Sequence, residues 1–367
     1  MASASPERLS EVQRRLLAWF RGHARDLPFR RDRSPYRVLV AEMMLQQTQA
    51  ATVGPYLERF CARFPTPQAL AAAPLQEVLT LWQGLGYYRR ARYLHAAAGQ
   101  IVREHGGVVP SGLADLRRLP GVGPYMAAAV ASFAFGRDEP AVDANARRVL
   151  ARVAGVERLD DALARMFVPA GQGAAWNEAV MDLGALVCLP RAPRCGRCPL
   201  LCCCGAQADG RTAELPARRP RPPRPSVPVL LLAVRDAAGR FGLERRPETG
   251  LLAGMWSFPI LEAEGGEVDP AAAAAGRGIR LGSVRALEPF RHVFTHRVWE
   301  VQPFAAEGEG DLYWAASADL QHLPIAGPSV PVLRRLAAGA SRQGCEGDGG
   351  YPSAGSRDGP PTSRARR

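Results

Sequence analysis

The chain has 367 residues and a formal net charge of +12. This length is enough for two or three domains with cores of their own, and the charge favours a polyanionic partner such as nucleic acid. The sequence contains no lysine at all, which indicates biased codon usage. Such a bias would by itself produce a surplus of arginine. Without lysine, the protein cannot form a lysine Schiff base with a substrate.

Two features of the sequence argue against export and membrane insertion. A helical pattern begins by about Ser10, which leaves no room for an N-terminal signal peptide. The longest apolar runs, such as residues 227–234, are too short to span a bilayer. We therefore expect a cytoplasmic protein, associated with the nucleoid if bacterial, that does not bind membranes.

The first part of the chain has the apolar spacing of helices and no convincing strand before residue 205. Ser34 and Pro35 supply an N-cap and a first-turn proline for one of these helices. The expected helical segments are 7–23, 36–50, 54–64, 74–83, 87–105, an Ala-rich helix from Pro124, 143–154, 158–168 and 174–187.

Residues 119–150 combine a candidate anion site with a lone acid. Gly121 and Gly123 allow a sharp turn, and Pro124 begins a helix whose N-terminus faces whatever the glycines approach. Such a helix start binds anions, and phosphate is the natural anion for a basic protein. Asp143 follows a break at Pro140; it is either the N-cap of the next helix or a carboxylate available to a substrate, and it can be both.

After residue 204 the composition changes twice. Residues 205–225 are rich in proline and arginine and predict an extended linker, which is either a solvated spacer or a segment that follows a phosphate backbone. Period-two patterns then predict strands, with a hairpin formed by residues 227–236 and 240–247. The expected domains are an all-α domain at 7–204, the linker at 205–225, an α+β domain at 226–338 with further strands at 256–262, 292–304 and 311–316 and a final helix from Ser329, and a disordered tail at 339–367.

Six of the eight cysteines lie between residues 188 and 204, which indicates a metal site in a reducing compartment rather than a set of disulfides. Cys188, Cys195, Cys198 and Cys204 have the spacing C-x6-C-x2-C-x5-C. Four thiolates suit a [4Fe–4S] cluster or zinc, and the single CxxC pair favours the cluster. Cys202 and Cys203 adjoin Cys204, so the identity of the fourth ligand stays open.

Glu42 lies in an apolar helical run, VLVAEMML. Its carboxyl group is either turned to solvent, the commoner case, or buried with a raised pKa and available as a general acid. Residues 46–49, QQTQ, are an amide-rich segment that either contacts base edges or forms a solvated helix face.

Residues 84–90, GLGYYRR, combine a flexible turn with paired tyrosines and arginines. This composition suits wedging into nucleic acid beside phosphate contacts, but core tyrosines followed by a basic helix face are an equal alternative. Asn145, two residues after Asp143, can bond a substrate or the backbone.

The motifs LPGVGPYMAAAV and VDANARRVL resemble the helix-hairpin-helix and catalytic aspartate of the endonuclease III superfamily of DNA glycosylases. AEMMLQQTQ, GLGYYRRAR, NEAVMDLGALVC and the cysteine spacing resemble its adenine-specific MutY branch, over residues from about 10 to 335. The resemblance implies an all-α glycosylase domain with a [4Fe–4S] cluster and an α+β Nudix-like domain. It also implies a monomer that removes adenine, without cutting the strand, from double-stranded DNA containing A:8-oxoguanine or A:G mispairs.

The resemblance assigns individual roles as well. Glu42 matches the general acid, Asp143 the aspartate that stabilises positive charge, and Tyr125 the position that is lysine in strand-cutting relatives. Positions that match pocket-lining, phosphate-binding or lesion-contacting residues are Arg30, Leu45, Gln47, Tyr87, Gly121, Gly123, Glu178, Phe294, Thr295 and His296.

The sequence departs from the family pattern at Phe29 (usually Trp), Ala144 (usually Gly) and Thr295 (usually Ser). Residues 265–278, GGEVDPAAAAAGRG, lack the glutamates that hold Mg²⁺ in Nudix hydrolases, so we do not expect nucleotide hydrolysis. Two alternatives stay open. Another glycosylase of the superfamily would ordinarily lack the second domain, and a catalytically silent DNA-binding iron–sulfur protein would not need both acids.

Overall fold

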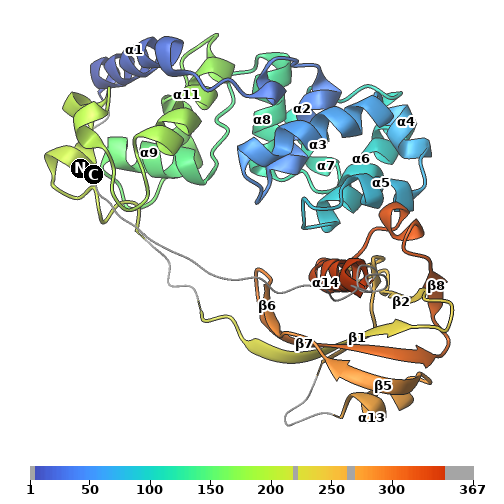
Figure 1. The fold of residues 1–367 in the computed structure, drawn as a ribbon. Helices are drawn as coiled ribbons and strands as arrows, with labels where there is room; N and C mark the ends of the chain where they lie inside the picture. Colours follow the sequence, from blue (N-terminus) through green and yellow to red (C-terminus); the bar gives the residue numbers. More distant parts are fainter. Residues whose placement is uncertain (1–4, 218–221, 263–268, 344–367) are drawn as a thin grey trace, which may run out of the picture.

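The structure, a computed structural model, describes residues 5–217, 222–262 and 269–343. Its first part is helical, and its second part is a sheet flanked by helices (Figure 1). Within the described residues, no helix is long and apolar enough to cross a membrane. The helices of the first part are α1 (Pro6–His23), η1 (Pro28–Arg30), α2 (Pro35–Leu45), α3 (Ala50–Arg63), α4 (Pro67–Ala72), α5 (Leu75–Leu81), α6 (Arg89–His105), α7 (Leu113–Arg118), α8 (Pro124–Phe135), α9 (Ala144–Ala154), α10 (Asp161–Met166), α11 (Gly173–Leu186), η2 (Cys195–Arg197), η3 (Leu201–Cys203) and α12 (Gly205–Ala208).

These helices form two lobes, each with its own hydrophobic core. The α2–α8 lobe contains the fully buried Phe60 and Trp82, and the α9–α11 lobe, which includes α1, contains Trp176. Figure 1 shows the two lobes side by side. Because α1 packs with the second lobe, the chain crosses between the lobes twice, at residues 24–34 and again at 136–143.

A buried amide holds the second crossing in place. Asn177 on α11 is 4% exposed; it accepts a hydrogen bond from the Ala141 N–H at 3.0 Å and donates to Ser132 Oγ and the Glu139 carbonyl at 2.9 and 2.8 Å. Every polar atom of its side chain is therefore bonded, as burial requires. These bonds position the segment that leads to Asp143.

The predicted hairpin between two helices is confirmed as α7, a turn and α8. Gly121 has φ of 78°, and a Cβ there would lie 2.7 Å from Cβ of Tyr93, so the turn requires glycine. Gly123 has φ of −87°, the N-cap position of α8 and open space where a Cβ would stand. Its backbone is therefore accessible to a partner.

The predicted linker at 205–225 is wrong in its first half. Residues 205–208 form α12, which packs on α9, and the Leu215 side chain is 2% exposed. Arg152 Nε donates to the Leu215 carbonyl at 2.9 Å, and Ala217 N–H donates to the Glu157 carbonyl at 3.1 Å. Residues 205–217 therefore belong to the first domain, because apolar burial and paired backbone groups hold them there.

The second domain is built on a mixed sheet with strand order β3-β2-β1-β7-β5, in which β4 pairs with β1, β6 with β7 and β8 with β2. In the central strand, alternate side chains enter two cores: Leu231 faces the core beside α14, and Leu232 faces the core beside α13. The elements are β1 (Ser226–Arg235), β2 (Phe241–Arg245), β3 (Trp256–Ser257), β4 (Ile260–Glu262), α13 (Pro270–Ala275), β5 (Arg280–Ala286), β6 (Phe290–Val293), β7 (Val298–Glu309), β8 (Tyr313–Ala315), η4 (Asp319–His322) and α14 (Ser329–Gln343).

The β1–β2 hairpin, β8 and the final helix are confirmed, but other predicted elements differ. The single strand predicted at 292–304 is the β6–β7 hairpin, whose turn is closed by the Phe294 N–H and the Arg297 carbonyl. The strand predicted at 256–262 is divided into β3 and β4, and β5 was not foreseen because its side chains are mostly exposed. The final helix continues to Gln343, past the predicted start of the tail at 339; residues 344–367 lie outside the described part.

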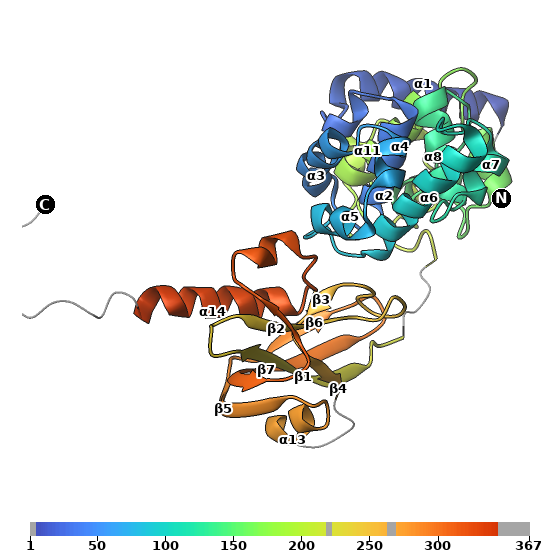
Figure 2. The same cartoon turned by 90° about the vertical axis from the view of Figure 1, so that its right-hand side faces the viewer.

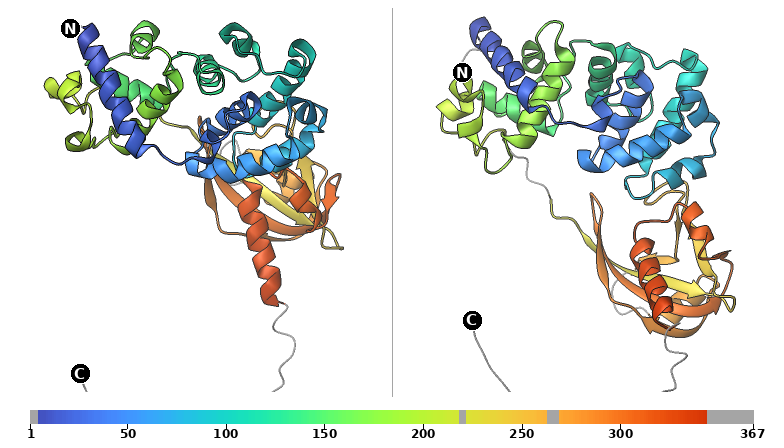
Figure 3. Two further views of the ribbon diagram at one scale, coloured as in Figure 1. Left: turned by 90° about the horizontal axis from the view of Figure 1, so that it is seen from above. Right: turned by 45° about the horizontal axis from the view of Figure 1, so that its top comes forward.

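Side chains of α5 and α6 connect the two domains. Arg92 forms an ion pair with Glu248 at 2.9 Å and donates to the Ala253 carbonyl, and Thr80 donates to the His322 carbonyl at 3.2 Å. Figure 2 and the right panel of Figure 3 show the second domain below the α2–α8 lobe, and the η4 segment contacts α5. These contacts join the sheet domain to the α2–α8 lobe.

Candidate active site

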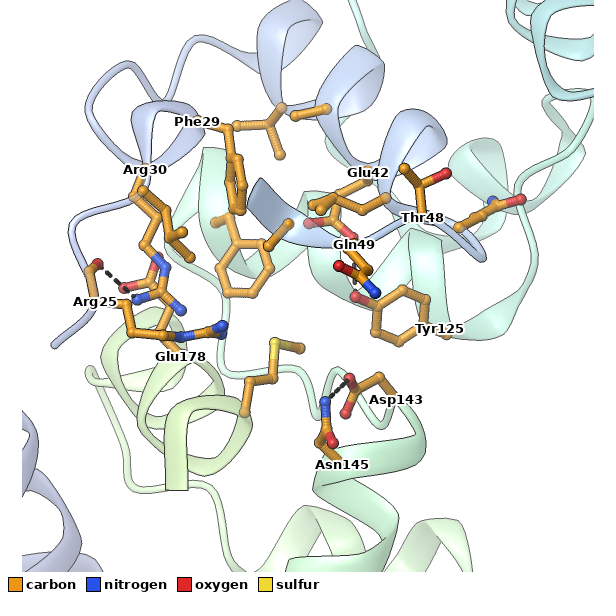
Figure 4. Close-up of a pocket in the computed structure, with 18 of the residues that line it drawn as sticks. Arg25, Phe29, Arg30, Glu42, Thr48, Gln49, Tyr125, Asp143, Asn145 and Glu178 are labelled. Carbon is orange, nitrogen blue, oxygen red and sulfur yellow. Dashed lines mark hydrogen bonds and ion pairs between the residues drawn. The ribbon is translucent and has the colours of Figure 1, made fainter. Parts of the chain in front are cut away.

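A pocket of about 580 Å³ lies between the two lobes. It is lined by α2, α8, the start of α9, α11 and the first crossing segment (Figure 4). This volume is in the usual range for small-molecule sites. The predicted site residues that line the pocket are Arg30, Glu42, Leu45, Gln47, Tyr125, Asp143, Asn145 and Glu178.

The structure decides between the two interpretations of Glu42. Its side chain is buried, 5% exposed, among the apolar residues of α2, and Tyr125 Oη donates a hydrogen bond to Oε2 at 2.9 Å. Burial raises the pKa of Glu42 to about 7, and the negative charges of Asp143 and Glu178 act in the same direction. The hydrogen bond from Tyr125 opposes the shift. At neutral pH a large fraction of the Glu42 carboxyl group is therefore protonated.

Asp143 is both an N-cap and a pocket residue. Its Oδ1 accepts the Ala146 N–H at 2.6 Å at the start of α9, and Oδ2 accepts from Asn145 Nδ2 at 3.2 Å. Burial raises the pKa of Asp143, and these hydrogen bonds oppose the shift. Arg148 fixes Asn145 in turn by donating to its Oδ1 at 2.8 Å. The Asn145 side chain thus bonds the aspartate, one of the roles open from the sequence.

A charged cluster forms the other wall, and only its members Arg30 and Glu178 were predicted from the sequence. Arg30 donates two hydrogen bonds to Asp182, at 2.9 and 2.8 Å, and Arg25 donates to the same carboxylate at 2.6 Å. Arg33 donates to both oxygens of Glu178, at 2.8 and 3.0 Å. Asp182 lies four residues after Glu178 on α11 and therefore on the same helix face. This spacing could have indicated from the sequence that Asp182 belongs to the site. Arg25 and Arg33 lie in the irregular crossing segment, and no pattern in the sequence indicated them.

The predicted helix over 36–50 is wrong at its end. Helix α2 stops at Leu45, and residues 46–49 form a turn in which Gln47 has φ of 58°. Thr48 and Gln49 line the pocket with Gln47, so this amide-rich segment is not a solvated helix face. Arg90, which the sequence predicted for a phosphate contact or a basic helix face, is buried instead and donates to the Gln46 carbonyl of this turn.

The other predicted contacts lie outside the pocket. Phe294 packs against Trp299 in the second domain with ring centroids 4.9 Å apart, whereas Thr295 and His296 are exposed in the β6–β7 turn. Thr295 Oγ1 and Tyr87 Oη form a hydrogen bond of 3.3 Å, although 208 residues separate them. The fold therefore brings the GLGYY loop and the Phe-Thr-His turn together.

The four predicted metal ligands line one small cavity beside Arg152: Cys188, Cys195, Cys198 and Cys204. Cys202 and Cys203 do not line it. Arg152 Nη1 donates to Cys188 Sγ at 3.4 Å. Yet within the described residues no three histidine, cysteine or acidic side chains are placed to hold a single metal ion.

Comparison with known proteins gives the family of this architecture. The family model of the HhH-GPD superfamily base excision DNA repair proteins matches residues 40–167, and that of the NUDIX domain matches residues 230–335. An adenine DNA glycosylase of Mycobacterium tuberculosis is 43% identical over 224 residues, which are 58% of this chain and 73% of that protein. The chain belongs to the adenine DNA glycosylase family.

Other adenine DNA glycosylases match a longer part of the chain. The protein of Rattus norvegicus is 37% identical over 320 residues, 70% of this chain, but the match spans only 61% of the rat protein's length. Among solved structures, a thermostable thymine-DNA glycosylase has a TM-score of 0.54 at 30% identity and covers 56% of this chain and 100% of its own. Endonuclease III in a non-covalent DNA complex has a TM-score of 0.51 at 25% identity, covering 57% and 99%. These two confirm the helix-hairpin-helix fold of the first domain.

Tyr125→Phe should raise the pKa of Glu42 above about 7, because the hydroxyl that stabilises the ionised carboxylate is lost. Infrared difference spectroscopy during a pH titration measures the protonated carboxyl band, and the Glu42→Gln variant, which lacks that band, assigns it. Phe133→Leu, a pocket change without a hydrogen bond to Glu42, is the control. An unchanged or lowered midpoint in Tyr125→Phe would show that the hydroxyl does not support the ionised form.

Proposed function

We propose that this protein is a monofunctional adenine DNA glycosylase, which hydrolyses the N-glycosidic bond of adenine opposite 8-oxoguanine or guanine and leaves the strand intact. The observation that carries the proposal is the pairing of two unlike carboxyl groups in one pocket. Glu42 is buried and about half protonated near neutral pH, whereas Asp143 accepts hydrogen bonds from Ala146 and Asn145 that favour its ionised form.

The two carboxyl groups divide the chemistry. Adenine is a poor leaving group until a ring nitrogen is protonated, and Glu42 holds a proton at the pocket wall for this transfer. As the bond to the sugar breaks, positive charge develops on the sugar, and the Asp143 carboxylate stabilises it electrostatically or by covalent attack. Water then completes the hydrolysis.

The residue at position 125 excludes the usual strand-cutting route. In the proposed mechanism the Tyr125 hydroxyl orients Glu42, and no lysine amine is present to attack the sugar and form a Schiff base. The reaction therefore ends at an abasic site.

The wall formed by Glu178 and its arginines selects the base. A purine reaches the pocket only after leaving the helical stack, which costs a few kcal/mol. Arg33 holds the Glu178 carboxylate as a hydrogen-bond acceptor at 2.8 Å. An acceptor at this wall favours the exocyclic amino group of adenine over a carbonyl oxygen.

We propose that the second domain recognises the opposite base through Phe294, Thr295 and His296. Thr295 and His296 are exposed at the tip of a hairpin that contacts Tyr87 of the first domain. Because this contact places the hairpin beside the GLGYY loop, both face the same DNA segment. Helix α13, in the region where Nudix hydrolases carry their metal-binding glutamates, consists of proline and alanine and has no carboxylates of its own.

The four cysteines fit a [4Fe–4S] cluster better than zinc. Structural zinc sites more often contain two short CxxC pairs, whereas this segment has one, and the four cysteines Cys188, Cys195, Cys198 and Cys204 line a common cavity. Bound there, a cluster would cross-link the 188–204 segment, and the Arg152 guanidinium would offset its thiolate charge.

The protein should release adenine from A:8-oxoguanine and A:G duplexes in single-turnover assays, with strand cleavage only after alkali. A:C and T:G duplexes are the comparison substrates. Glu42→Gln should lower the rate by about 10² or more and leave duplex binding intact. The wild-type rate should fall about tenfold per pH unit above the Glu42 pKa of about 7, because the protonated form is lost. Preferential release of thymine from T:G, or cleavage without alkali, would contradict the proposal.

His296→Ala should reduce the preference for A:8-oxoguanine over A:G, because a donor and a ring surface at the hairpin tip are lost. The ratio of kcat/KM values on the two duplexes measures the preference. His23→Ala removes an exposed histidine of α1 and is the matched control. If His296→Ala slows both duplexes equally, the hairpin does not distinguish the opposite base.

Substitutions of two adjacent cysteines, Cys203 and Cys204, test which of them is a ligand of the cluster. Cys204→Ser should lose iron, sulfide and the visible absorbance of the cluster, whereas Cys203→Ser should retain them, because only Cys204 lines the cavity. Metal analysis of both purified variants decides the question. Stoichiometric zinc in the wild-type protein, or retention of the cluster in Cys204→Ser, would contradict the assignment.

A further inference from the structure

One buried arginine binds two separate loops of the α2–α8 lobe. Arg90, on the first turn of α6, is 5% exposed. Its Nη1 donates to the carbonyls of Met43 at 3.2 Å, Met44 at 2.6 Å and Gln46. These are carbonyls at the C-terminal end of α2, which have no partner within the helix and need an outside donor.

The other end of the same guanidinium binds the second loop. Arg90 Nη2 donates to the carbonyls of Leu85 and Gly86, at 3.2 and 3.0 Å, and to Thr48 Oγ1 at 3.0 Å. The group also lies 5.5 Å from the ring centroids of Trp82 and Tyr87. Burial lowers the pKa of Arg90 to about 10, which leaves it charged at neutral pH.

Each of these loops carries a residue in an unfavourable backbone conformation. Gln47 has φ of 58° and Tyr87 has φ of 49°, values that L-residues other than glycine and asparagine rarely adopt. Such conformations persist only where the surroundings enforce them. In both loops, carbonyls next to the strained residue accept hydrogen bonds from Arg90.

We propose that Arg90 is a positioning residue that fixes Gln47 and Tyr87 together as one preformed wedge, and that this wedge drives extrusion of the target base without taking part in bond cleavage. The inference rests on the proposed function, since it assigns a step of that reaction. Gln47 is exposed and lines the pocket, and Tyr87 is 48% exposed, so both are available to a duplex.

The wedge is joined to the other surfaces expected to contact DNA. The Gln46 side chain donates to the Gly121 carbonyl at 3.5 Å in the α7–α8 turn, and Tyr87 bonds Thr295 of the second domain. Arg90 itself has no bond to either carboxyl group of the active site. It therefore acts on how the base reaches the pocket and not on the protonation of Glu42.

Only arginine supplies this geometry. The planar guanidinium offers donors in a fixed fork that faces both loops, whereas an ammonium is a point charge that reaches one of them. Arg90→Lys keeps the charge and the aliphatic stem but loses the fork, and Arg90→Met loses both. The control is Arg335→Met, because Arg335 also donates to a carbonyl, that of Glu288, and lies over an aromatic ring, that of Phe290, far from these loops.

The experiment has one arm without DNA and one with it. In the free protein, amide hydrogen exchange should accelerate at residues 46–49 and 84–88 together in both Arg90 variants and in neither loop in Arg335→Met. With a duplex that carries 2-aminopurine as the target base, the fluorescence rise on binding should be reduced when either Arg90 change is added to Glu42→Gln. The single-turnover rate on A:8-oxoguanine should fall by roughly 10²-fold, with the midpoint of its pH profile unchanged.

Several outcomes would overturn the inference: acceleration of exchange in only one loop or in neither, an undiminished 2-aminopurine signal, or a shifted pH midpoint. A lower melting temperature of the Arg90 variants with normal 2-aminopurine fluorescence would show that Arg90 contributes only to stability. This result would also overturn the inference. Failure of the wild-type protein to release adenine would instead contradict the proposed function. In that case the exchange arm still decides whether Arg90 fixes both loops.

Discussion

The hydrogen bond from Tyr125 to the buried Glu42 carboxyl group is the interaction around which the pocket is arranged. It joins α2 to α8 within one lobe, and the other lobe supplies Asp143 and Glu178, whose charges raise the pKa of the same carboxyl group. Burial alone would neutralise Glu42, and a closer cation would ionise it. The two lobes together hold the pKa of Glu42 at about 7, which the proposed role of this carboxyl group as a general acid requires.

This balance depends on how the chain crosses between the lobes. The first crossing carries Arg30, whose strongest bonds go to Asp182 and not to Glu42. Burial disfavours the charged form of Asp182, but the hydrogen bonds from Arg30 and Arg25 lower its pKa below the usual value. Burial raises the pKa of Glu42 to about 7 although the charge of Arg30 opposes the shift. The second crossing, fixed by Asn177, presents Asp143 at the opposite side.

The sequence predicted the elements that repeat a simple pattern. The α1, α6, α9 and α11 helices were foreseen from apolar spacing, and Tyr125 and Asp143 from their place in a motif. It failed where a long-range contact overrides local preference. Nothing near residue 46 in the sequence shows that α2 ends there, because the donor that caps it, Arg90, lies more than forty residues away. The hairpin at Phe294 was likewise hidden, since alternating residues continue through its turn.

Arg152 and Arg90 stabilise loops in the same way at two different sites. Each is buried, and each donates to several carbonyls from distant segments: Arg152 to Leu189 and Leu215 beside the cysteines, Arg90 to Met44 and Gly86 beside the pocket. The hydrogen bonds of each guanidinium join segments that are distant in the sequence, so each arginine restricts the arrangement of the loops around it. In a chain without lysine, the loops that carry function are held by arginine forks, which specify geometry as well as charge.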